Sequence, residues 1–430
     1  MSSSFCSFRE RAICKLCHSR SLSPRSTIKR QEFWISKQII RISLKLIRKD
    51  HFSYLQPILP YKMASHMKSL IIFFALTTIQ IHTVCSLPIS LPSDKDIRVG
   101  VTGNDKSPET LIHSHSNLFG LPEADGNLHI YALPVGNGDA SVIQCPLGDV
   151  IILDMGQMSD VGWQPSQVKY FLSGHLQHIT TIVISHPTES HYMILTELIT
   201  DYSQVPQLRR IILAGQYYDY DRYEMIQWMN KFQPLIHFVN GGFPCVSDCY
   251  IEPPSCEGSN HTVSFKILAA NLGEYRQGRS ITMHIKTEKP NFQLFWQGDV
   301  RGVDIEDQIV KEWSMLGYSL NSTHMKIGNR ASKYDESNTE TLLNAVTPQF
   351  AFSSNPYPGR WNLKPDCRTI FRVVGILSVG KRSRSGNFAC QNYNTFQVDQ
   401  FENWCYNVFT TAPSPSDNSV VAIDVDLSKK

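Results

Sequence analysis

Imidazole and carboxylate side chains follow two apolar segments that lie more than a hundred residues apart. His186 and His191 belong to the sequence Ser-His-Pro-Thr-Glu-Ser-His at 185–191, which closes one apolar segment. Asp299 follows the other apolar segment, 292–297, after a single glycine. Side chains of these types at the ends of rigid strands are what a protein-built metal site requires. The residues therefore predict a pocket with the donors for a transition metal.

The elements that would position these residues alternate between strands and helices. Strands are predicted at 128–134, 141–145, 150–153, 180–185, 209–214, 236–239, 262–269, 281–286, 292–297 and 350–353. Helices are predicted at 166–178, 191–202, 221–232, 303–315, 337–346 (with Ser337 as its cap) and 368–375. This order indicates a single α/β domain in which two packed sheets lie between layers of helices.

Several motifs resemble the metallo-β-lactamase superfamily, and within it the hydrolase-like domain of bacterial competence (DNA-uptake) proteins. The matching segments, in chain order, are Val-Gly-Asn-Gly-Asp-Ala at 135–140, Ile-Ile-Leu-Asp-Met-Gly at 151–156, the histidine segment 185–191, Gly-Asp at 298–299, His324, and 355–365. The resemblance implies an αββα four-layer sandwich over residues 128–412. It also implies one or two metal ions at the edge of the sheets, where a metal-bound water attacks a phosphoester, thioester or amide.

The family pattern can be carried onto this chain residue by residue. The resemblance implies that His186, His191, Asp299 and His324 are the remaining metal ligands. It implies that Asp154 braces the histidine loop from behind. For each ligand a structural role stays open, because a histidine can simply hydrogen-bond its loop and a Gly-Asp carboxylate can accept backbone N–H groups in a turn. Asp139 is expected to serve only the tight turn at 135–140.

The same comparison shows departures from the family pattern. Thr188 replaces a ligand, and Ser190 replaces the aspartate that ligates the metal and orients the attacking hydroxide. A neutral hydroxyl is a poor zinc ligand beside carboxylate or imidazole, so Ser190 is expected only behind the ligand set. Lys364 stands where the family has histidine, and its ammonium would repel a cation. The implied centre is degenerate, with either no metal or a single zinc or manganese ion.

The N-terminal part of the chain reads as an export signal with sequence ahead of it. Residues 63–86 have a lysine, an apolar stretch and small residues, and the apolar stretch is shorter than a membrane span. Residues 1–62 carry 13 Lys and Arg against three acidic residues and are interpreted as a non-native upstream or disordered segment. A basic cytosolic tail on a membrane anchor is the alternative. Residues 87–127 are expected to be a linker and 413–430 a disordered tail.

Cysteine usage agrees with export. Three disulfides are predicted among six cysteines, without assigned pairing, and Cys145 is expected to be a buried free thiol. The six are Cys245, Cys249, Cys256, Cys367, Cys390 and Cys405. A zinc site made by the first three of them with His261 is the alternative. Asn260 and Asn321 begin glycosylation sequons.

Charge argues against a nucleic-acid partner. Residues 87–430 carry 27 Lys and Arg and 35 Asp and Glu, so they gain nothing from attraction to phosphates. The leading hypothesis is a secreted protein with a degenerate, inactive metal site that acts as a binding or extracellular-matrix component. The alternative is a secreted metal-dependent hydrolase of phosphodiesterase type with one metal. The extracellular partner cannot be read from the sequence, and no transmembrane span is expected after residue 86.

Overall fold

The computed structural model describes most of the chain from residue 110 onward. The described residues are 99–100, 110–115, 118, 120–158, 162–239, 255–256, 263–272, 279–288, 291–300, 302–332, 337–355, 365–377, 386–392, 394–402, 407–412 and 418–428. All of them belong to one compact unit, 94–430. The export signal predicted at 63–86 and the non-native or disordered segment predicted at 1–62 lie outside the described residues.

The first sheet is formed by strands from both ends of this unit. In spatial order its strands are β1 (Val99–Gly100), β2 (Thr110–His115), β17 (Val420–Val425), β3 (Leu128–Ala132), β4 (Ala140–Gln144), β5 (Val150–Met155), β6 (Ile179–Ile184), β7 (Arg210–Leu213) and β8 (Ile236–Phe238). Strands β5 to β8 run parallel. The others pair antiparallel. Strands β5, β6 and β7 are almost entirely buried, as expected for strands covered on both sides.

The second sheet packs against the first. Its strands, in spatial order, are β15 (Val398–Glu402), β14 (Asn387–Gln391), β16 (Val408–Thr410), β13 (Phe350–Ser353), β12 (His324–Lys326), β11 (Phe292–Gln297), β10 (Ile281–Thr287) and β9 (Val263–Ala270). Side chains from the facing sheets share one core, which includes Ile151, Val183, Met283 and Trp296. Alternate residues of the first sheet, such as Ile152, point instead into a second core under the helices.

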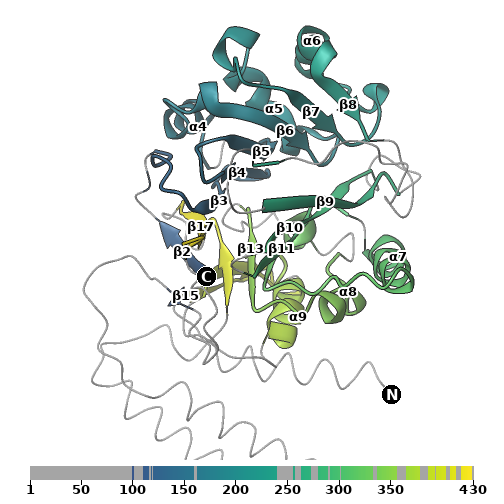
Figure 1. Ribbon diagram of the computed structural model, residues 1–430. Coiled ribbons are helices and arrows are strands. Elements are labelled where there is room, and N and C mark those ends of the chain that lie inside the picture. Colours follow the sequence, from purple (N-terminus) through teal and green to yellow (C-terminus); the bar gives the residue numbers. More distant parts are fainter. Residues whose placement is uncertain are drawn as a thin grey trace, which may run out of the picture. The chain divides into compact units, whose positions relative to one another are not determined.

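Helices cover the outer face of each sheet (Figure 1). On the first sheet these are α4 (Pro165–Phe171), α5 (Glu189–Leu198) and α6 (Tyr223–Phe232); on the second they are α7 (Gly302–Met315), α8 (Glu340–Val346) and α9 (Cys367–Leu377). Short 3-10 turns lie at Leu176–His178, Tyr202–Gln204, Tyr217–Asp219, Gln233–Leu235 and Gly328–Ala331. The α/β arrangement of four layers, helix–sheet–sheet–helix, predicted from the sequence is confirmed.

Two helix predictions need correction in detail. The helix expected at 166–178 ends at Phe171, because Gly174 takes a left-handed conformation (φ 84°), and the chain then makes a separate 3-10 turn. Helix α8 is capped by Thr339, whose Oγ1 accepts from the N–H of Leu342 at 3.2 Å. The predicted cap, Ser337, instead donates to the carbonyl of Val300 at 2.9 Å.

The structure contradicts the disordered tail predicted at 413–430 and part of the linker predicted at 87–127. Strand β17 lies between β2 and β3, and Ile423 pairs with both Ile112 and Ile130. Its sequence, Val-Val-Ala-Ile-Asp-Val, is buried almost throughout. The partner strands are about three hundred residues earlier in the chain, so no local pattern announces the pairing. Strands β14 to β16 were likewise not predicted.

Disulfides join parts of the described chain, with one change to the prediction. Cys145 is not a free thiol, because it is bonded to Cys256, 111 residues later. Cys367 is bonded to Cys390 and ties the start of α9 to β14. Cys245, Cys249, Cys405 and the sequon at Asn260 lie outside the described residues.

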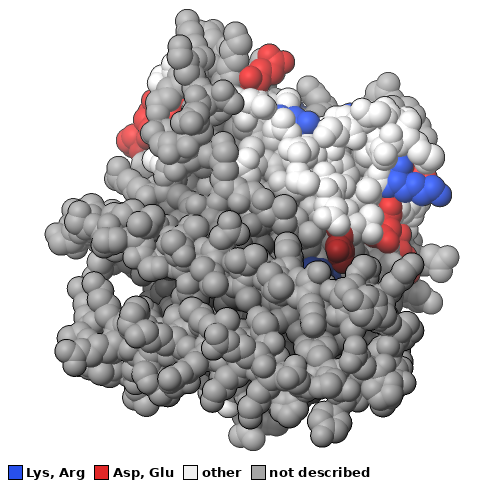
Figure 2. Space-filling model, turned by 90° about the horizontal axis from the view of Figure 1, so that it is seen from below, with Lys and Arg blue, Asp and Glu red and all other residues white. Residues whose placement is uncertain are grey.

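The described residues on the face shown in Figure 2 form no continuous basic patch. Figure 2 shows separated groups of basic and acidic side chains among the described residues of that face. Among the described helices, none combines the length and the hydropathy that crossing a bilayer requires.

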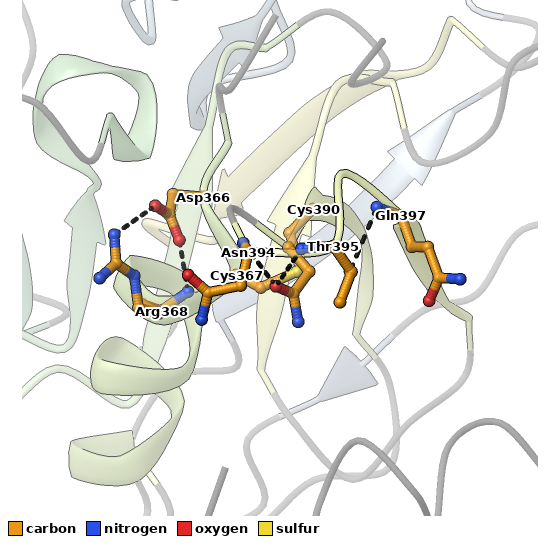
Figure 3. The surroundings of a disulfide bond; sticks show 8 residues. Asp366, Cys367, Arg368, Cys390, Asn394, Thr395 and Gln397 are labelled. Carbon is orange, nitrogen blue, oxygen red and sulfur yellow. Dashed lines mark hydrogen bonds and ion pairs between the residues drawn. A yellow bond between two sulfur atoms is a disulfide. The ribbon is translucent and has the colours of Figure 1, made fainter. Parts of the chain in front are cut away.

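The Cys367–Cys390 bond lies beside a capped helix start (Figure 3). Asp366 Oδ1 accepts from the N–H of Arg368 at 2.7 Å, and its other oxygen lies 3.3 Å from the guanidinium of the same residue. The disulfide therefore ties the first turn of α9 to the second sheet, and the cap stabilises that turn.

Polar side chains hold β17 between its neighbours. Asp424 of β17 lies 2.6 Å from His129 Nδ1 and 3.1 Å from His113 Nε2, and Asp125 lies 2.8 Å from His129 Nε2. Burial lowers the pKa of His129, but the two carboxylates outweigh it and raise the pKa above 6.5. Burial raises the pKa of Asp424, but the two imidazoles outweigh it and lower the pKa below 3.8.

We predict that Asp424→Asn destabilises the fold by about 1–3 kcal/mol, with the largest loss at mildly acidic pH. The His129 contribution is complete below the unfolded pKa of 6.5 and is lost as the pH rises through the raised folded value. The Asp424 contribution is complete above 3.8 and is lost as the pH falls through the lowered folded value. Urea unfolding across pH, with the exposed Asp304→Asn as control, checks this. A loss that does not vary with pH would contradict it.

Candidate functional site

Asp154 connects the elements that form the site. It is the extra residue of a β-bulge, since Ala140 pairs with Met155 and Ser141 pairs with Leu153. Its backbone is left-handed (φ 59°), which is uncommon for a residue other than glycine and turns the side chain out of the regular pleat. The carboxylate accepts from the backbone N–H and from the hydroxyl of Ser185, each at 2.6 Å.

The same carboxylate fixes the second histidine of the predicted loop. Asp154 Oδ2 lies 3.0 Å from Nδ1 of His191, which is the third residue of α5. The end of β5 approaches the start of α5 so closely that a Cβ on Gly156 would lie 2.2 Å from the backbone nitrogen of His191. This contact explains why the Asp-Met-Gly sequence ends in glycine. Asp154 thus contacts both Ser185 and His191 of the histidine loop.

The turn before β4 contributes a carboxylate to the same place. The N–H of Asp139 donates to the carbonyl of Ser190 at 2.8 Å, and the N–H of Gly156 donates to the carbonyl of Asp139 at 2.9 Å. These bonds join the predicted turn at 135–140 to the start of α5 and to the residue after β5. The side chain of Asp139, however, lies with His191 and Asp299, and one donor atom from each residue lies within 4.8 Å of the other two. The sequence analysis did not assign Asp139 to the site.

Two basic side chains complete the cluster, and neither was predicted. Lys326 Nζ lies 3.1 Å from Asp139 Oδ1 and donates to the carbonyl of Gln297 at 2.9 Å. One terminal nitrogen of Arg330 lies 3.1 Å from Asp299 Oδ2, and the other lies 4.0 Å from Asp139 Oδ2. His191 Nε2 lies 3.2 Å from the same Asp299 oxygen. The residues of this ion-pair cluster are Asp139, Asp154, His191, Asp299, Lys326 and Arg330.

The cluster is closed to solvent and balanced in charge. Each of its residues is buried, and Asp299 is the most accessible at 9%. Burial lowers the pKa of His191, but Asp154 and Asp299 outweigh burial and raise the pKa to about 9. The imidazole is therefore cationic at neutral pH, and three acidic side chains face three cationic ones.

The four predicted ligands do not converge on one point. His191 and Asp299 are neighbours. His186 lies beside them, with ring centroids of the two histidines 5.3 Å apart, and its Nδ1 lies 3.0 Å from the carbonyl oxygen of Arg279. Burial and the adjacent His191 lower the pKa of His186 to about 4.

His324 lies in a different environment. Its ring centroid is 5.1 Å from that of Phe292 and 5.0 Å from that of Phe350, with which it stacks, and its Nδ1 is 2.9 Å from Thr323 Oγ1. Burial lowers its pKa to about 3, so it is a neutral core residue. His324 is the first residue of β12. The residue of this strand that reaches the cluster is Lys326, at its other end.

The remaining predicted positions are also accounted for. Ser190 is buried, and its hydroxyl lies 3.1 Å from that of Thr188, so these two side chains satisfy each other. Lys364 lies outside the described residues. Asn321 is exposed and precedes β12, whereas the cluster lies past the other end of that strand, and its amide donates to Thr347 Oγ1 at 2.6 Å.

The side chains in the cluster fit a metal ion in spacing but not in charge. Asp139, His191 and Asp299 supply the two carboxylates and one imidazole that a single divalent ion would use. Arg330 and Lys326 already contact the carboxylate oxygens that would ligate. The spacing therefore allows a single ion, but only if Lys326 and Arg330 give up their contacts with these carboxylates.

Comparisons with known proteins reach only distant structures. No family model matches the chain, and no curated protein matches it. Solved structures that resemble it include the metallo-β-lactamase fold protein YhfI from Bacillus subtilis (9% identity, 66% of this chain and 98% of that one, TM-score 0.35). Human tRNase Z, short form, has 13% identity over 53% and 92% of the chains (TM-score 0.33). Unliganded yeast PDE1 has 11% identity over 68% and 91% (TM-score 0.33). At these scores they carry no argument about activity.

We predict that Asp154→Asn destabilises the protein by about 3–5 kcal/mol, because it leaves a buried His191 cation without its nearest carboxylate. Ser190→Ala serves as the matched control, since it removes one buried hydroxyl contact and should cost about 1 kcal/mol. Urea unfolding of both variants measures the difference. Equal losses would show that Asp154 does not carry the loop.

Proposed function

We propose that this chain is a secreted, non-hydrolytic protein that uses a metallo-β-lactamase-like sandwich as an extracellular binding or matrix component. The single observation that carries the proposal is the ion-pair cluster. The pocket where the fold family implies metal chemistry is filled by Arg330 and Lys326, which contact Asp299 and Asp139. A hydrolytic centre needs an open coordination position and a water-orienting acid.

The histidine loop supports the same proposal. At the position where the resemblance implies a catalytic aspartate, the chain has Ser190, and its hydroxyl is engaged by Thr188. Since Ser190, His186 and His191 are all buried, the loop does not present them to a substrate. The loop acts as an internal support between β6 and α5.

Cysteine pairing supports an extracellular location. The bonds Cys145–Cys256 and Cys367–Cys390 join distant parts of the chain, which is typical of proteins that fold in an oxidising compartment. The signal-like sequence at 63–86 and the sequon at Asn321 agree with this. The excess of acidic residues beyond residue 86 disfavours a nucleic-acid partner.

A metal-dependent hydrolase remains a second candidate because of one specific observation. Donor atoms of Asp139, His191 and Asp299 lie within 4.8 Å of one another, which is close enough for one ion. This set differs from the sequence-based set, since it contains Asp139 and lacks His186 and His324. The two candidates differ in whether purified protein contains metal.

The test is metal analysis and hydrolysis assays on the full chain expressed in secreting eukaryotic cells. We expect substoichiometric zinc and manganese, and no hydrolysis of a bis-aryl phosphodiester, a thioester or a β-lactam when either metal is added. His191→Ala is the control. Stoichiometric metal together with hydrolysis, both lost in His191→Ala, would establish the hydrolase instead.

Export is tested separately on the same cells. We expect the protein in the culture medium, with a mature N-terminus near residue 87 and a glycan on Asn321. A chain retained in the cytosol with its cysteines reduced would refute the extracellular part of the proposal and leave the metal analysis unaffected.

A further inference from the structure

We propose that Arg330 is a built-in cation that takes the place of a metal ion, so that the cluster is a latent metal site held closed by its own guanidinium. This inference deepens the proposed function and rests on it. Arg330 is the residue that excludes the metal, and replacing it should allow the cluster to bind a metal ion.

Position is the first argument. Asp299 Oδ2 is shared between His191 Nε2 at 3.2 Å and Arg330 at 3.1 Å. A metal ion bound to that oxygen and to that nitrogen would lie about 2 Å from each. The ion would then compete with the guanidinium for the same oxygen, at a separation where two cations repel strongly in a buried site. Arg330 and a metal are therefore alternatives.

Charge is the second argument. Buried carboxylates require a cation or several hydrogen-bond donors, and leaving them unpaired is costly. Lys326 compensates Asp139, while Arg330 lies between Asp139 and Asp299. A guanidinium stays charged under all physiological conditions. The fold thus carries its counter-charge covalently and does not depend on the metal supply of its surroundings.

The backbone gives the third argument. Arg330 lies in the 3-10 turn Gly328–Ala331, in which Asn329, Arg330 and Ala331 all have positive φ (46°, 49° and 57°). Left-handed conformations are unfavourable for such residues and persist only when surrounding contacts impose them. The N–H of Asn329 donates to the carbonyl of Gly298, and the N–H of Asp366 donates to the carbonyl of Ala331. The first bond holds the turn against the strand end that carries Asp299, and the second fixes the other end of the turn to the residue before α9. Arg330 lies between these two anchors, with its guanidinium 3.1 Å from the Asp299 carboxylate.

The experiment replaces Arg330 by a ligand and, separately, by a neutral group of similar length. Arg330→His removes the cation and adds an imidazole beside His191 and Asp299, whereas Arg330→Gln removes the cation alone. Each protein is freed of metal with a chelator and titrated with Zn²⁺, and its unfolding temperature is measured with and without Zn²⁺.

We expect wild type to bind Zn²⁺ weakly and to unfold at the same temperature with and without it. Arg330→His should bind one Zn²⁺ with an affinity higher than that of wild type by roughly 100-fold, and Zn²⁺ should raise its unfolding temperature. Arg330→Gln should show a smaller gain. Wild type that binds one Zn²⁺ as tightly as Arg330→His would overturn the inference, and so would a folded Arg330→His that gains no binding.

Two further measurements decide the matter if Arg330→His does not fold. Wild type that has been unfolded in urea without a reducing agent should refold fully in excess chelator, because the cation that balances its buried carboxylates is part of the chain. A requirement for metal during refolding would refute the inference. Arg330→Lys keeps the charge and should fold without gaining Zn²⁺ affinity; a gain would refute it as well. If these measurements contradict the inference but purified wild type is metal-free and inactive, the proposed function is unaffected. If wild type is metal-bound and active, both the inference and the proposed function are refuted.

Discussion

The carboxylate of Asp154 is the contact on which the rest of the site depends. It sits at a β-bulge in a left-handed conformation, accepts two bonds from Ser185 and faces His191. One buried anion thereby joins the end of β5, the end of β6 and the start of α5. Once His191 is fixed, Asp299 has a cationic neighbour, and Arg330 and Lys326 balance the remaining acidic side chains. The ion-pair cluster therefore depends on the β-bulge that places Asp154.

Glycine spacing makes this arrangement possible. The end of β5 and the first turn of α5 meet with no room for a side chain at Gly156. At Gly298 a Cβ would lie 2.6 Å from the hydroxyl of Ser185. Gly156 and Gly298 belong to motifs that are far apart in the sequence, yet both lie against the histidine loop at 185–191. Their shared purpose is to let strand ends from the two sheets reach the same histidine loop.

Much of the framework could be predicted from the sequence, because strands such as 292–297 and helices such as 303–315 have clear periodicity. The sandwich followed from the order of these elements. Strand β17 could not be predicted, since its partners are about three hundred residues away. The disulfide of Cys145 was missed because a cysteine in an apolar strand looks like a core thiol.

The candidate site was predicted only in part, for a physical reason. Histidines attract attention as ligands, yet His324 packs between aromatic rings as a neutral core residue, and the residues that reach the site from the same region are Lys326 and Arg330. Charged residues beside an apolar strand, in Met-Lys-Ile-Gly-Asn-Arg, were the available signal. Burying a lysine in such a strand requires an anionic partner, and that requirement points to Asp139 and Asp299.

The placement of β17 within the first sheet has a consequence for biogenesis. A ribosome releases residues 420–425 long after it has made β2 and β3, so these two strands must wait for their shared neighbour. During that interval, edges that the finished sheet covers lie open to pairing with other chains. We infer that the protein needs protection while it is being synthesised, and that shortening its C-terminus would produce aggregates rather than a smaller stable domain.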